Sequence, residues 1–169
     1  MINWSRRLFA PRRDGRFDVR LAPEVRLGIV SLAEQLDEVQ SGDGPETRRL
    51  FPTAYPDDPD RDAGYQIFAR DQLISKRREA VEIIRATAEA DVLTGEQLSS
   101  WMGILNDIRL VLGTTLDISE DDEGVDPDAP DAESRLLYQF LGELVHEMVM
   151  SLTTTLPEPE DDDPAGENA

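Results

Sequence analysis

The stretch TGEQLSSWMGILNDIRLVLG, residues 94–113, predicts the central element of this protein. Thr94 is followed three residues later by Gln97, which is a capping box that satisfies free backbone N–H groups at the start of a helix. Apolar side chains then recur at spacings of three and four residues, at Leu98, Trp101, Leu105, Ile108 and Leu112. This spacing predicts a helix over about residues 95–113 that ends near Gly113.

Three other segments also carry helical patterns. One begins at Pro23, a residue that the first helical turn tolerates, and ends at the Gly/Pro-rich residues 41–45. Another contains no proline and has a loose apolar stripe that includes Tyr65 and Phe68. The last has an apolar arc wider than one helix contact needs, so it is either central or an oligomer face. The predicted ranges are about 23–40, 62–90 and 131–153.

The N-terminal residues predict a small β hairpin over residues 4–21. Apolar Phe17, Val19 and Leu21 alternate with Arg16, Asp18 and Arg20, as in a half-buried strand. Asp14-Gly15 is a turn signal, and residues 4–9 are the predicted partner strand. Because a two-stranded ribbon is marginal alone, we expect it to pack against helices.

Together these patterns predict a mainly α fold: a four-helix bundle-like single domain over residues 1–155, with the hairpin at its N-terminus. The loop 46–61 carries Leu50, Phe51 and Tyr55, which are costly to leave in water, so it should dock on the helix 95–113. The acidic residues 117–130 predict a flexible loop, and the acidic tail 156–169 is expected to be disordered.

Composition narrows the function classes. The formal net charge of −19 makes unaided binding to nucleic acid unfavourable. The chain has no cysteine, which excludes disulfides and thiol chemistry within it. It has no apolar run long enough for a membrane span and no signal-peptide core, so we expect a cytoplasmic protein that does not bind membranes.

The sequence indicates no metal or cofactor. Glu143-x-x-His146 has the spacing found in di-metal bundles, but such a site needs a second histidine, and His146 is the only one. We expect His146 to be exposed. The acidic loop does not fit a calcium-binding loop, because Pro130 occupies the position of the bidentate glutamate.

Among the polar residues of the predicted helix 95–113, the most informative are Asn106, Asp107 and Arg109, which lie among its apolar side chains. Asp107 and Arg109 are two residues apart, so they point to different faces and should have different partners. Two interpretations stay open. The three side chains hydrogen-bond the neighbouring loop or helix ends, or they form a polar pocket for a ligand or a partner.

Basic residues cluster at two other places. The helix 62–90 carries five of them, and the N-terminal residues carry five more that lie closer together in the sequence. These are Arg70, Lys76, Arg77, Arg78 and Arg85, and Arg6, Arg7, Arg12, Arg13 and Arg16. On the helix, a solvated side with acidic neighbours is the simpler interpretation, and a surface for an acidic partner or nucleic acid is the alternative.

Two motifs are similar to those of one family. They are Arg49-Leu50-Phe51-Pro52-x-Ala54-Tyr55 with Asp57-Asp58, and Trp101-x-x-x-Leu105-Asn106-Asp107-x-Arg109-Leu110-x-Leu112-Gly113. The chain resembles the actinobacterial family called domain of unknown function 2017, over roughly residues 4–118 and the last helix. The resemblance implies a small cytosolic protein, encoded in many cases beside the Clp protease adaptor. Some members are named as regulators of transcription or of oxidative stress, but a cysteine-based redox role does not carry over to this chain.

These observations lead to a functional hypothesis. We expect a non-enzymatic regulatory protein of stress-linked transcription, which acts through a protein partner without direct contact to nucleic acid. The alternatives are an accessory factor of Clp-type proteolysis, or a small-ligand binder that uses the Asn106/Arg109 region. A homodimer through the helix 131–153 is a further expectation. The candidate binding residues are Arg49, Phe51, Tyr55, Trp101, Asn106, Asp107 and Arg109.

Overall fold

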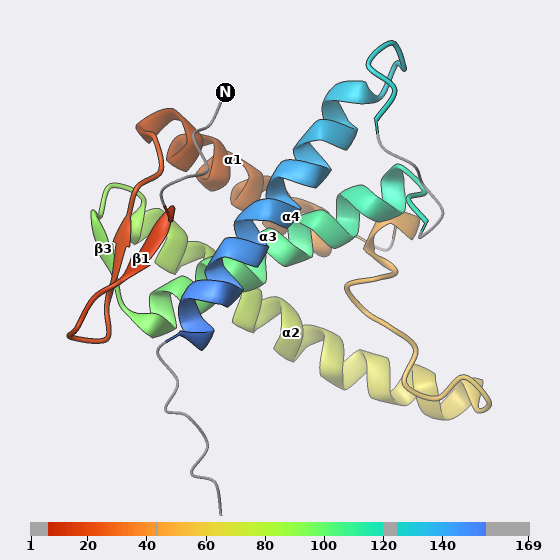
Figure 1. Ribbon diagram of the computed structural model, residues 1–169. Coiled ribbons are helices and arrows are strands. Elements are labelled where there is room, and N and C mark those ends of the chain that lie inside the picture. Colours follow the sequence, from red (N-terminus) through yellow and green to blue (C-terminus); the bar gives the residue numbers. More distant parts are fainter. Residues whose placement is uncertain (1–6, 43, 120–124, 155–169) are drawn as a thin grey trace, which may run out of the picture.

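The computed structural model describes residues 7–42, 44–119 and 125–154 (Figure 1). The elements follow the order β1 (Phe9–Pro11), β2 (Phe17–Val19), α1 (Pro23–Gln40), a short 3₁₀ helix η1 (Pro45–Thr47), α2 (Pro59–Thr87), β3 (Val92–Leu93), α3 (Gly95–Thr115) and α4 (Ala132–Thr153). The predicted mainly α fold with an N-terminal hairpin is confirmed. Part of the predicted flexible loop, residues 120–124, and the predicted disordered tail lie outside the described residues.

Helix α3 is the central element, in contact with α1, α2 and α4. Its apolar side chains Leu98, Trp101, Ile104, Leu105 and Ile108 are buried. The predicted capping box is present: Thr94 Oγ1 accepts from Gln97 N at 3.2 Å, and Gln97 Oε1 accepts from Thr94 N at 2.9 Å. The predicted helix therefore begins where its sequence indicates.

The predicted end of this helix at Gly113 is wrong by two residues. The helix continues to Thr115, and Gly113 is buried within it. A Cβ at this position would lie 3.0 Å from both Arg49 Nη1 and Tyr138 Cε2. The glycine thus allows two side chains to approach the helix backbone closely, and it does not end the helix.

We predict that Thr94→Ala lowers the free energy of unfolding by about 1 kcal/mol, because the first turn of α3 loses its side-chain acceptor. Urea denaturation followed by circular dichroism measures the change. Ser99→Ala, at an exposed position of the same helix, is the matched control and should leave stability nearly unchanged. Equal stability of both variants would show that the cap contributes nothing.

The sheet has three antiparallel strands in the order β1-β2-β3. The predicted partner strand over residues 4–9 begins too early among the described residues: β1 starts at Phe9, which pairs with Val19, and residues 4–6 lie outside the described residues. The reason is the turn, where Arg12 N donates to Arg16 O at 2.8 Å and Gly15 has a φ of 76°. A loop this short places Pro11 opposite Phe17 and fixes the register.

The third strand was not predicted from the sequence. Helix α2 ends at Thr87, not near residue 90, and the chain then turns so that β3 pairs with β2. Two residues are too few to show an alternating pattern. The hairpin also packs against α4, where Ser151 Oγ donates to Phe9 O at 2.5 Å and Glu147 accepts from Leu8 N at 3.3 Å.

Helix α2 starts three residues before the predicted position, because Pro59 is accepted at a helix start and Asp58 caps the helix by accepting from Arg61 N at 3.1 Å. Its buried residues are Val81, Ile84 and Thr87, all in its C-terminal half. The N-terminal half extends away from the other helices (Figure 1). Among the described residues, we find no helix that is long and apolar enough to cross a membrane.

Candidate functional site

Trp101 belongs to the core. Its side chain is 1% exposed, and its Nε1 donates to Thr87 Oγ1 at 2.9 Å. Thr87 is the last residue of α2, so this bond joins the end of α2 to the middle of α3. The geometry gives Trp101 a packing role and leaves little of its side chain for a partner to touch.

The loop after η1 docks on the helices as expected. Leu50 is buried in the core, and the Phe51 ring lies beneath the guanidinium groups of Arg70 and Arg77, at 4.2 and 5.0 Å. Arg49 reaches the end of α3, where its Nη2 donates to Ile118 O at 3.2 Å. The sequence-predicted residues Arg49 and Phe51 therefore fix the loop to the body.

An arginine of α2, Arg77, holds this loop against the helices. Arg77 Nη2 donates to Leu50 O at 3.1 Å, and its Nε donates to Asp107 Oδ2 at 2.8 Å. The loop is thus bound by an arginine of α2 that Asp107 orients. Asp107 therefore reaches the loop only through this arginine, and Arg109 does not hold the loop because its guanidinium faces Tyr138 of α4.

Asp107 and Arg109 have separate partners, as their spacing predicted. Asp107 pairs with Arg77, whereas the Arg109 guanidinium lies 4.6 Å above the ring of Tyr138 in α4. Asp107 lines a cavity of about 370 Å³ between α2 and α3, and Arg109 lines one of about 750 Å³ beside α4. Asp107 and Arg109 thus line different cavities, and Asn106 and Tyr55 line neither of these two.

Tyr55 stabilises the N-terminal half of α2. Its ring lies 4.1 Å from the guanidinium of Arg61 and packs edge-on against Tyr65 at 5.9 Å between ring centroids. Asp62 Oδ1 accepts from the backbone N atoms of Ala54 and Tyr55, at 2.7 and 3.0 Å. The loop therefore runs along this half of the helix and holds it in place.

We call residues 59–73 of α2 the α2 arm. Among the described residues of the arm, none is buried, and four large apolar side chains are exposed: Tyr65, Ile67, Phe68 and Leu73. Ile67 is 75% exposed and Phe68 is 71% exposed. The sequence analysis placed Tyr65 and Phe68 in the apolar stripe that faces the core. That assignment is wrong, because the other helices cover only the C-terminal half of α2. The irregular spacing of the apolar residues in this stripe was the one sign in the sequence that part of the helix is exposed.

The basic residues of α2 mostly bind within the chain. Arg78 pairs with Asp37 at 2.9 Å and Arg85 pairs with Glu34 at 2.9 Å, and both acids belong to α1. Burial raises the pKa of Asp37, but hydrogen bonds from Arg78 and Gln40 outweigh it and leave this pKa below the ordinary value. These arginines connect two helices and do not form a free basic surface.

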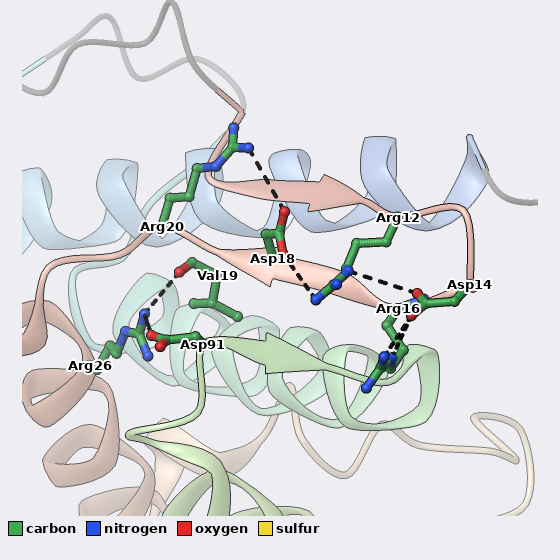
Figure 2. Close-up of polar contacts among 8 residues, drawn as sticks. All are labelled: Arg12, Asp14, Arg16, Asp18, Val19, Arg20, Arg26 and Asp91. Carbon is green, nitrogen blue, oxygen red and sulfur yellow. Dashed lines mark hydrogen bonds and ion pairs between the residues drawn. The ribbon is translucent and has the colours of Figure 1, made fainter.

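The hairpin arginines also share carboxylates, as Figure 2 shows. Asp14 accepts from Arg16 at 2.6 Å, and Asp18 lies 3.5 Å from Arg12 and 3.9 Å from Arg20. Hydrogen bonds from Arg16 lower the pKa of Asp14. The alternation predicted from the sequence is therefore correct, with the charged side chains on the outer face of β2.

Arg26 is a structural residue that the sequence analysis missed. It is 8% exposed, and its guanidinium donates to the backbone oxygens of Val19, Leu21 and Ala90 at 2.9, 3.0 and 2.7 Å. Figure 2 shows dashed lines from its guanidinium to Val19 and to Asp91, whose Oδ1 lies 3.7 Å from Arg26 Nη2. An arginine within a helical pattern gives no local signal of such burial.

Helix α4 carries the remaining candidates. His146 is exposed, as predicted. In the part of the chain that the structure describes, no group of three or more His, Asp or Glu is arranged to hold a metal ion. The homodimer through this helix stays a prediction.

The protein is thus small and mainly α. The N-terminal end of its helix α2 projects from the rest of the fold (Figure 1), and a cavity lies beside α4. The sequence matches the family described as Domain of unknown function (DUF2017) over residues 5–152, so the chain belongs to this family. The resemblance predicted from the two motifs is confirmed. Comparisons with curated proteins and with solved structures found no match.

Proposed function

We propose that this protein is a non-enzymatic regulator of stress-linked transcription that binds a protein partner through the α2 arm. The observation that supports a binding role is the exposure of Tyr65, Ile67, Phe68 and Leu73 within nine residues of one helix end. Large apolar side chains gathered on a surface mark interaction sites more often than scattered ones do.

The arm is ordered although it contributes none of the buried residues of α2. Asp62 binds two backbone N–H groups of the loop, and Gln66 Nε2 donates to Pro52 O at 2.9 Å. Leaving Ile67 and Phe68 in water forgoes about 1.5–3 kcal/mol for each side chain. A fixed helix end presents this surface without further loss of conformational entropy on binding, which favours a partner with an apolar groove.

A protein is the partner class that the charge favours. The net charge of −19 repels nucleic acid, and carboxylates already pair with Arg16 of the hairpin and with Arg78 and Arg85 of α2. The link to transcription comes from the regulators named within the family that the chain resembles. From this link we propose a component of the transcription machinery as the partner.

Affinity purification from native cytosol with quantitative mass spectrometry tests this proposal. We expect the tagged chain to recover a transcription component at near-stoichiometric yield. The double variant Ile67→Ser/Phe68→Ser should lower this yield at least tenfold, since about 3 kcal/mol of apolar contact is lost. Leu27→Ser is the matched control, because Leu27 is 64% exposed on α1, and it should retain the yield.

Two outcomes would contradict the proposal. Recovery of a Clp subunit in place of a transcription component would favour the alternative role in regulated proteolysis. Equal yields from the double variant and from the wild-type chain would exclude the arm as the binding surface.

A further inference from the structure

We propose that the cavity beside α4 binds a small organic monocarboxylate, with Arg109 as the anchoring cation. The cavity has a volume of about 750 Å³, within the range of small-molecule sites. Polar side chains on its wall are Arg109, Gln139, Glu143 and His146, and the larger apolar and aromatic ones are Leu136, Tyr138 and Phe140. This site is separate from the arm and does not rest on the function proposed above.

Arg109 differs from the arginines of α2 that pair with α1 and α3, because its guanidinium has no acceptor among the described residues. Arg77, Arg78 and Arg85 each bond a carboxylate. Among the described residues, none forms a hydrogen bond or an ion pair with Arg109, and its buried Nε has no partner. A half-buried cation without an acceptor is unfavourable, so an anion that enters the cavity would supply what the protein does not.

The packing of α3 on α4 fixes the position of this guanidinium. Its carbon lies 4.6 Å from the centroid of the Tyr138 ring, and a Cβ at Gly142 would lie 3.2 Å from Nε. Tyr138 and Gly142 are one turn apart on α4, so the guanidinium lies flat across that helix. Since Nε is covered, the terminal Nη atoms are the donors left for a ligand, and little side-chain freedom is lost when they bind.

The wall selects the chemistry of the ligand. Two Nη donors in one plane match the two oxygens of a carboxylate. The apolar side chains favour a ligand with an apolar body over a small inorganic ion. Glu143 also lines the cavity, and its negative charge disfavours a ligand with a second charge. A monocarboxylate with an aromatic or aliphatic body therefore fits better than a phosphate.

Titration of the full chain with benzoate, followed by NMR of the Arg109 Nε–H resonance, tests this inference. Benzoate should shift this resonance in a saturable way, and its neutral analogue benzamide should not. Arg109→Gln should weaken benzoate binding by at least about tenfold, the loss expected for a charged hydrogen bond. Arg85→Gln is the control, because Arg85 pairs with Glu34 and does not line the cavity. This variant should leave the affinity for benzoate unchanged.

Several results would overturn the inference. These are the absence of a saturable shift with benzoate, equal effects of benzoate and benzamide, tighter binding of inorganic phosphate, or unchanged affinity in Arg109→Gln. If Arg109→Gln does not fold, the wild-type titrations decide alone. The arm variant Ile67→Ser/Phe68→Ser should bind benzoate normally, so the two proposals fail or succeed separately.

Discussion

Replacing Arg26 by methionine is expected to lower the free energy of unfolding by about 3–5 kcal/mol, because the buried guanidinium serves several backbone acceptors at once. It donates to Val19 O at the end of β2, to Leu21 O before α1, and to Ala90 O before β3. Methionine is apolar and would leave these buried oxygens without donors. The variant would thus lose the hydrogen bonds by which α1 holds the end of β2 and the segment just before β3 (Figure 2).

Denaturation with guanidinium chloride, followed by circular dichroism, measures this loss. Arg85→Met is the matched control, because Arg85 is an exposed arginine that pairs with Glu34. An exposed pair contributes at most about 1 kcal/mol. If the two variants lose the same stability, the proposed role of Arg26 is incorrect.

The second large effect is expected for Trp101→Ala, which should lower the free energy of unfolding by about 3–5 kcal/mol. The change removes a large side chain from the core and leaves a cavity between α2 and α3. It also removes the donor to Thr87 Oγ1. Chemical denaturation followed by far-ultraviolet circular dichroism measures it.

Phe68→Ala is the control for this prediction, since it removes an aromatic ring that is exposed on the arm. Its effect on stability should stay within about 0.5 kcal/mol. A Trp101→Ala variant that keeps wild-type stability but no longer binds the partner would contradict the packing role. That result would support the earlier prediction that Trp101 contacts the partner.

Much of the fold follows from local signals in the sequence. The capping box at Thr94, the start at Pro23 and the alternation around Phe17 each reflect a rule that acts within a few residues. These signals predicted the helices and one strand correctly. The start of β1, the strand β3 and the ends of α2 and α3 depend on pairing and packing between distant segments, which local patterns do not show.

Less of the candidate site than of the fold could be predicted from the sequence. Helix geometry separated Asp107 from Arg109, and in the structure Asp107 contacts Arg77 of α2 whereas Arg109 contacts Tyr138 of α4. The partners of the two side chains could not be predicted, because they depend on how the helices pack in the tertiary structure. The exposure of Ile67 and Phe68 was also hidden, because an apolar residue on a helix has the same local pattern whether or not a neighbouring helix covers it.

Photo-crosslinking in cells tests the central claim, that the α2 arm is the partner surface, most directly. A photoreactive phenylalanine derivative at position 68 should form an adduct with a transcription component, whereas the same group at position 27 of α1 should not. A position 68 that gives no adduct, or adducts of equal yield at both positions, would contradict the account.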